Sequence, residues 1–123
     1  MGYLTDRKRA VGMGSAKRGT EHFWHMKVSS VALLVLIPLF VFTFGTAIGE
    51  NHTYVVAYFA RPLPSLIAAL TLIVGFDHFK SGATVLIEDY VHGIGQKICI
   101  IGVTCLSYAA MATGLFALAK MAF

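Results

Sequence analysis

The sequence predicts an all-α membrane protein whose single domain contains three transmembrane helices. Of its 123 residues, 57% are hydrophobic and only 13% are charged, and the mean hydropathy is +0.73. A soluble domain of this size needs a polar surface that so few polar residues cannot supply. Three apolar stretches reach the ~20 residues that a helix needs to cross a bilayer. Since lipid can cover a helix on every side, a protein with several spans accounts for this composition.

Four segments follow one another along the single domain, residues 1–123. Residues 1–25 are polar and basic and are expected to form an N-terminal arm. The first span covers about 26–48 and contains Pro38, which is expected to kink the helix without ending it, because membrane helices tolerate proline. The second span covers about 63–87 and the third about 97–119. The short connections between them predict an up-down-up arrangement.

Basic residues are distributed unevenly over the two sides of these spans. Six of the ten lysines and arginines precede the first apolar stretch, Lys97 follows the 88–96 loop, and the other loop contains only Arg61. Because loops rich in Lys and Arg stay in the cytoplasm or matrix, the N-terminus and the 88–96 loop are expected there. The net charge of +4 is therefore a topology signal, and no nucleic-acid partner is expected. The lack of a clear transit peptide favours a bacterial cytoplasmic (inner) membrane over a mitochondrial one.

The second span carries three ionisable residues well before its expected end: Asp77, His78 and Lys80. An Asp or Lys near the middle of a membrane helix costs ~2.5–3.5 kcal/mol, so such residues persist where they face a cofactor, a cavity or a partner. His78 lies ~14 Å from the cytoplasmic end of the helix, where a neutral imidazole can ligate haem iron. Gly82, one turn further on, leaves room on the same face for a flat porphyrin. A histidine that is hydrogen-bonded to a neighbouring helix is the alternative interpretation.

The other four histidines are expected at different depths from His78. His22 and His25 precede the first span and belong to the cytoplasmic interface. His52 lies in the opposite loop, and His92 lies in the cytoplasmic loop. A haem held by two histidines would therefore take its second ligand from another chain, which predicts that this protein is a subunit of a complex.

The second span ends in a polar sequence that contains Asp89 and Tyr90. Asp89 lies 11 residues after His78, almost three turns, so both share one face of the helix. The phenol of Tyr90, at the cytoplasmic interface, can donate one hydrogen bond into an apolar pocket, which recognition of a quinone carbonyl requires. A tyrosine of the aromatic belt at the membrane surface is the alternative interpretation.

Together these residues form the pattern H-x3-G-x6-D-Y at the end of a membrane helix. The pattern resembles the second helix of the smaller hydrophobic membrane anchor subunit of succinate dehydrogenase (respiratory complex II), which binds haem and quinone. The segment KRGTEHFWHMKVSSVAL is also similar to that family, and so are the chain length and the three-span layout. The resemblance covers essentially the whole chain, and the spacing from His78 to Asp89 and Tyr90 is its most specific part.

The resemblance implies two binding roles for the second span. His78 would be an axial ligand of a b-type haem, and Gly82 would allow the haem to approach the helix. Tyr90 would hydrogen-bond a carbonyl of ubiquinone, and Asp89 would support that site or its proton supply.

Two lysines are further candidates for contact with the haem. Lys27 stands where the family often has arginine, which keeps the charge but loses the bidentate geometry, and it would contact a propionate or a lipid headgroup. Lys80 would contact a propionate, although snorkelling or a pairing with Asp77 explains it equally well.

The resemblance also implies three protein partners. A second, companion hydrophobic anchor subunit would share the haem and pack with this chain into a helix bundle, next to an iron–sulfur subunit and a flavoprotein subunit. The chain has no dinucleotide-binding fingerprint, and its two cysteines form no CxxC, so the flavin and the clusters are expected in the partners. Within the tricarboxylic acid cycle it would serve electron transport to quinone, with no catalytic chemistry of its own.

Two other functions remain open on the residues alone. One is the anchor of a related fumarate reductase. The other is a small homo-oligomeric transporter in which Asp77, His78 and Lys80 form a proton relay inside the membrane.

Overall fold

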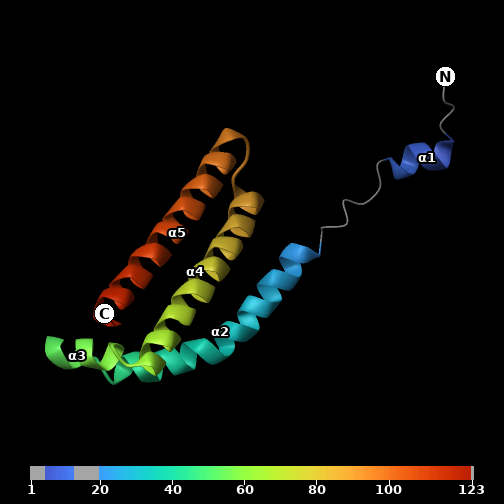
Figure 1. The fold of residues 1–123 in the computed structure, drawn as a ribbon. Helices are drawn as coiled ribbons and strands as arrows, with labels where there is room; N and C mark the ends of the chain where they lie inside the picture. The colour runs from blue at the N-terminus through green and yellow to red at the C-terminus, as the bar shows by residue number, and fades with distance from the viewer. Residues whose placement is uncertain (1–4, 13–19, 123) are drawn as a thin grey trace.

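The computed structural model describes residues 5–12 and 20–122, and the regular elements within these ranges are all α-helices. Three of the helices are long and apolar enough to cross a membrane. The prediction of an all-α protein with three membrane-spanning helices is therefore confirmed. In chain order (Figure 1), the helices are α1 (Asp6–Val11), α2 (Glu21–Gly45), α3 (His52–Phe59), α4 (Pro62–Tyr90) and α5 (Ile94–Ala122).

The three long helices, α2, α4 and α5, differ from the predicted spans by a few residues at their ends. Helix α2 begins at Glu21, inside the predicted arm, and α4 continues to Tyr90. Hydropathy marks where a helix meets lipid, whereas the backbone hydrogen bonds continue into polar residues on either side. Glu21 favours the early start because an acidic side chain in the first turn complements the helix dipole. Pro62 opens α4 at a position where its missing N–H costs nothing.

The predicted N-terminal arm is described only in part. Helix α1 contains the basic residues Arg7, Lys8 and Arg9 and stands apart from the other helices in Figure 1. Residues 1–4 and 13–19 of the arm lie outside the described residues.

Helix α3 lies in a segment that the hydropathy pattern predicts to be a loop. Asn51 caps it, since the Asn51 side chain accepts a hydrogen bond from the backbone N–H of Tyr54 at 2.8 Å. Phe59, at the end of α3, is only 4% exposed and packs in an apolar cluster with Ala47, Ala68 and Leu118. This cluster closes the end of the bundle opposite the loop between α4 and α5 (Figure 1).

Helix α4 is the central helix of the bundle. It packs against α2 on one side and α5 on the other (Figure 1). Gly114 of α5 allows a close approach to α4, since a Cβ at this position would lie 2.9 Å from Leu72 Cδ1. Functional side chains on α4 therefore reach either neighbour, depending on the face from which they project.

The outward faces of the three long helices are apolar. Large side chains on them are largely exposed, such as Leu34 (75%), Phe42 (75%) and Phe116 (71%). Water would not favour such a surface, but lipid or another hydrophobic chain covers it without cost.

Candidate functional site

Two neighbouring residues of α4, Asp77 and His78, hold α2 through polar contacts. The Oγ of Ser29 lies 2.8 Å from Nδ1 of His78, and Nε2 of His25 lies 3.1 Å from Oδ2 of Asp77. His25 and Ser29 are four residues apart, so they share one face of α2. These two contacts fix the register of α2 against α4 at the depth of the predicted haem ligand.

His25 lies deeper than its place in the sequence predicts. Because α2 begins at Glu21, His25 belongs to the helix, and its side chain reaches the residue next to His78 in the sequence. One ring nitrogen of His25, Nε2, is engaged by the Asp77 carboxylate. The difference in membrane depth between His25 and His78 is therefore smaller than the sequence predicts.

His78 lines an open groove on the side of α4 that faces α2. The groove has a volume of about 460 Å³, and its other lining residues are Ser30, Leu33, Leu34, Ile37 and Pro38. A Cβ added to Gly82, one turn along α4, would meet no atom within 4 Å. The half-buried imidazole thus stands beside a largely apolar wall and an open helix surface, which suits a flat apolar ligand.

Lys80 belongs to a different face of α4. Its Nζ lies 2.7 Å from Oδ1 of Asp77 and donates to the hydroxyl of Tyr108 on α5 at 3.1 Å. The same ammonium lies 4.9 Å from the centre of the Tyr108 ring. The structure contains the predicted pairing of Lys80 with Asp77, and the contact of Lys80 with a haem propionate stays a prediction.

The Asp77→Ala variant is expected to reduce the amount of this chain that accumulates in the membrane. The change leaves the Lys80 ammonium without its counter-charge, and an unpaired charge at this depth costs ~2.5–3.5 kcal/mol. Immunoblotting of membranes after matched expression measures the effect. The double variant Asp77→Ala/Lys80→Ala removes both charges and should recover most of the loss. A double variant as poor as the single one would show that the ion pair is not the cause.

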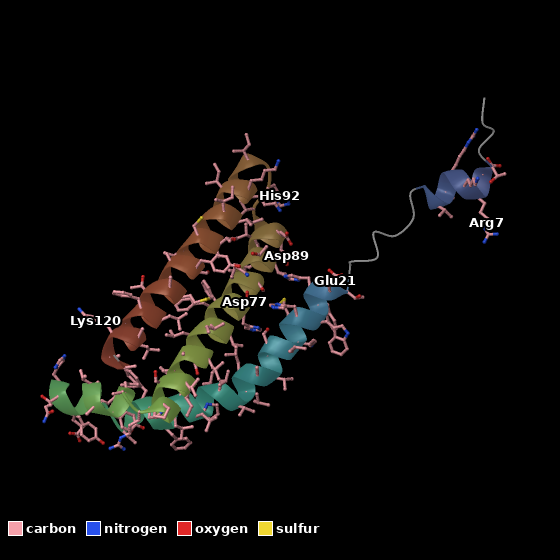
Figure 2. The ribbon with its side chains drawn as sticks, viewed as in Figure 1. Arg7, Glu21, Asp77, Asp89, His92 and Lys120 are labelled. Carbon is pink, nitrogen blue, oxygen red and sulfur yellow. The ribbon has the colours of Figure 1, made fainter. Side chains whose placement is uncertain are left out.

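Asp89 and Tyr90 lie at the end of α4, where the predicted quinone contact was placed. Both are exposed, and Tyr90 is 78% exposed. Helix α4 ends directly after them, with Val91 as its cap. Figure 2 shows Glu21, Asp89 and His92 toward one end of the bundle and Lys120 toward the other. The Tyr90 phenol is therefore available to a ligand or a partner at the end where α2 begins.

Lys27 lies between these two regions, on an exposed part of α2. Its Nζ lies 5.3 Å from the centre of the Phe23 ring, a cation–π distance. Lys27 lies two residues before Ser29, and its charge stays at the surface. It is therefore close to His78 in depth, but it does not contact His78.

The structure also contains polar contacts that the sequence did not reveal. Ser29 was not singled out and His25 was placed at the interface, although the pattern H-x3-S places two polar side chains on one face of an otherwise apolar helix. The spacing of His25 and Ser29 was the sequence signal for a polar contact between α2 and another helix. The partner residues on α4 depend on how the two helices are aligned, which the spacing does not determine.

Comparisons with known proteins agree with the architecture. Residues 1–119 match the family described as the succinate dehydrogenase/fumarate reductase transmembrane subunit. The chain is 47% identical over 121 residues to the succinate dehydrogenase hydrophobic membrane anchor subunit of Paracoccus denitrificans, which covers 98% of this chain and 94% of that protein. It is 28% identical over 85 residues to the succinate dehydrogenase membrane anchor subunit of Reclinomonas americana, which covers 67% of this chain and 71% of that protein. No solved structure matches the chain.

The family match spans nearly the whole chain, and the Paracoccus relative shares almost half of its residues. Three apolar helices long enough to cross a membrane fit the same assignment. The chain therefore belongs to the succinate dehydrogenase/fumarate reductase transmembrane subunit family and is a membrane anchor subunit of succinate dehydrogenase.

Proposed function

We propose that this chain supplies His78 as one axial ligand of a b-type haem and forms part of the ubiquinone-reduction site of its complex. The observation that carries the proposal is the environment of His78. Ser29 holds one ring nitrogen, Nδ1, while the ring lines an open and largely apolar groove. The second nitrogen, Nε2, is then the one available to iron.

The residues around His78 fit a haem. A porphyrin needs a flat apolar surface, a nitrogen ligand and close access to the helix backbone, and the groove, His78 and the open position at Gly82 supply these three features. A bound b-type haem would supply one-electron transfer. The part of this chain is to orient the imidazole and to exclude water from the α2–α4 side. The other axial ligand would come from the companion anchor subunit.

Tyr90 and Asp89 support the proposed quinone site. A quinone carbonyl is a strong acceptor, and the Tyr90 phenol is a single donor exposed at the end of α4. The Asp89 carboxylate beside it accepts hydrogen bonds and can hold a proton near the reduced carbonyl. At 12 residues from His78, Tyr90 lies ~18 Å further along the helix.

The charge distribution and the likeness to a bacterial relative support a location in the bacterial cytoplasmic membrane, with the N-terminus in the cytoplasm. The partners of the proposed complex are the companion anchor subunit, an iron–sulfur subunit and a flavoprotein subunit. Electrons from succinate would reach quinone at the cytoplasmic surface beside Tyr90.

The two alternative functions have less support. The family description includes fumarate reductase, but both named relatives are anchors of succinate dehydrogenase, which favours succinate oxidation. A proton relay through Asp77 and Lys80 is not needed to explain these residues, because they pair with each other, with His25 and with Tyr108.

Purification of the complex through a tag on this chain tests the proposal. We expect a flavoprotein and an iron–sulfur protein to co-purify, and we expect a b-type haem band in the reduced-minus-oxidised difference spectrum. A colourless chain that purifies alone, or with copies of itself, would contradict the proposal and favour a transporter.

A further inference from the structure

A buried serine contacts the proposed haem ligand. Ser29 is 7% exposed, and its Oγ lies between two polar groups. One is Nδ1 of His78, at 2.8 Å, and the other is the backbone carbonyl of Met26 in the preceding turn of α2, at 3.0 Å. The serine thus links the imidazole to the backbone of the neighbouring helix.

The chemistry of these groups determines where the protons lie. A hydroxyl has one hydrogen, and the carbonyl of Met26, which also accepts from Oγ of Ser30 at 2.7 Å, is an acceptor that Ser29 reaches within its own helix turn whatever the state of His78. We take Ser29 to donate its hydrogen to this carbonyl. The Ser29 oxygen then accepts a hydrogen bond from His78, which requires a proton on Nδ1 of the imidazole. In a neutral imidazole, Nε2 is then the nitrogen with the free lone pair.

The opposite arrangement is less favourable in this groove. If Ser29 donated to Nδ1, the proton of the neutral ring would sit on Nε2. The groove that His78 lines is largely apolar, with Ser30 as the only other polar residue among the described residues of its lining, so it offers an Nε2–H few acceptors. A polar hydrogen left without a partner in apolar surroundings is costly, so the environment also favours the proton on Nδ1.

We propose that Ser29 is a positioning residue that holds His78 in the Nδ1–H form and so presents Nε2 as the iron-ligating atom. This inference depends on the proposed function, since it concerns the same ligand. It adds a residue from α2, 49 positions earlier in the chain, to the site on α4.

Such a contact has a measurable effect on a bound haem. A hydrogen bond from Nδ1–H to an oxygen makes the imidazole a stronger electron donor to iron, which favours the oxidised metal. Removal of the acceptor should shift the midpoint potential of the haem to a more positive value. It should also weaken haem retention by about 10- to 100-fold, the usual effect of losing a hydrogen-bond partner of a metal ligand.

The Ser29→Ala variant in the intact complex tests the inference. We expect haem to remain bound, with a more positive midpoint potential in a redox titration and faster transfer of haem to excess apomyoglobin. The matched control is Ser81→Ala. Ser81 is equally buried, at 6% exposed, but its hydroxyl donates at 2.9 Å to the backbone carbonyl of Asp77 within its own helix. The control should keep the potential and the transfer rate of the unaltered complex.

Two more variants at Ser29 test whether the acceptor oxygen is the cause of the shift in potential. Ser29→Thr retains an acceptor oxygen and should restore the original potential. If Ser29→Ala does not assemble, Ser29→Cys offers a weaker acceptor of similar size and should shift the potential in the same direction by less.

An unchanged potential and transfer rate in Ser29→Ala, or in Ser29→Cys where alanine fails, would overturn the inference. The proposed function would survive that result if His78→Ala still removes the bis-histidine spectrum. If His78→Ala keeps that spectrum, the haem ligation by His78 fails, and the role of Ser29 fails with it.

Discussion

The His78→Ala variant is expected to lose the bis-histidine b-type haem spectrum of the purified complex. Alanine has no lone pair to offer, and His78 is the histidine whose ring lines the open groove. Reduced-minus-oxidised spectra and haem content per flavin measure the effect. We expect either loss of the haem or an altered spectrum in which only the companion subunit's ligand remains on the iron.

A matched control is available on the neighbouring helix. The His25→Ala variant removes a histidine that is paired at 3.1 Å with Asp77, the residue next to His78, so the haem spectrum should persist. Dye-linked succinate oxidation, which does not use the membrane anchor, should survive in both variants. A normal spectrum in His78→Ala would exclude His78 as the ligand, and loss of the spectrum in His25→Ala alone would transfer the role to His25.

Hydropathy was sufficient to predict the three spans, because a helix that meets lipid must be apolar over ~20 residues whatever its neighbours are. Residue type and spacing were sufficient to single out His78, since an ionisable residue is rare at such depth. The eight-residue helix α3 was missed because it is too short to cross a membrane and its sequence is mixed. Its signal was the N-cap residue Asn51, whose side chain accepts a hydrogen bond from the backbone of Tyr54.

The contacts between helices could not be predicted from the sequence. The pairing of Ser29 with His78 depends on the axial alignment of α2 and α4, and a shift of one turn would replace it with another pair. Lys80 illustrates the same limit. Its pairing with Asp77 was one of the predicted possibilities, but its contact with Tyr108 of α5 depends on how α4 and α5 are aligned.

The arrangement around α4 places the ammonium of Lys80 away from the proposed haem ligand. His78 and Lys80 are two residues apart, about 200° around the helix, so they serve opposite neighbours. The Asp77 carboxylate, which also contacts His25 of α2, compensates the charge of Lys80, and the neutral Tyr108 hydroxyl of α5 accepts a hydrogen bond from it. On the α2 side, His78 meets the neutral hydroxyl of Ser29 and a largely apolar groove wall.

The Tyr90→Phe variant is expected to lower succinate:ubiquinone reductase activity by about tenfold, the effect of losing one hydrogen bond of about 1.4 kcal/mol at the reaction step. Tyr90 is 78% exposed at the end of α4, so loss of its hydroxyl should not disturb the packing of the helices. The quinone-reductase and dye-linked activities of the same preparation should therefore separate, with only the first one reduced. Steady-state assays with a short-chain ubiquinone and with an artificial dye measure the two.

Tyr54 provides the control for a tyrosine of the aromatic belt. It is exposed to 43% and lies on α3, toward the other end of the bundle, so Tyr54→Phe should leave both activities unchanged. If Tyr90→Phe also leaves both unchanged, Tyr90 is a belt residue and the quinone contact lies elsewhere. If both activities fall together, the phenol acts in assembly of the complex. Only the selective loss of quinone reduction places the Tyr90 hydroxyl at the quinone, because the dye takes its electrons before they reach the membrane anchor.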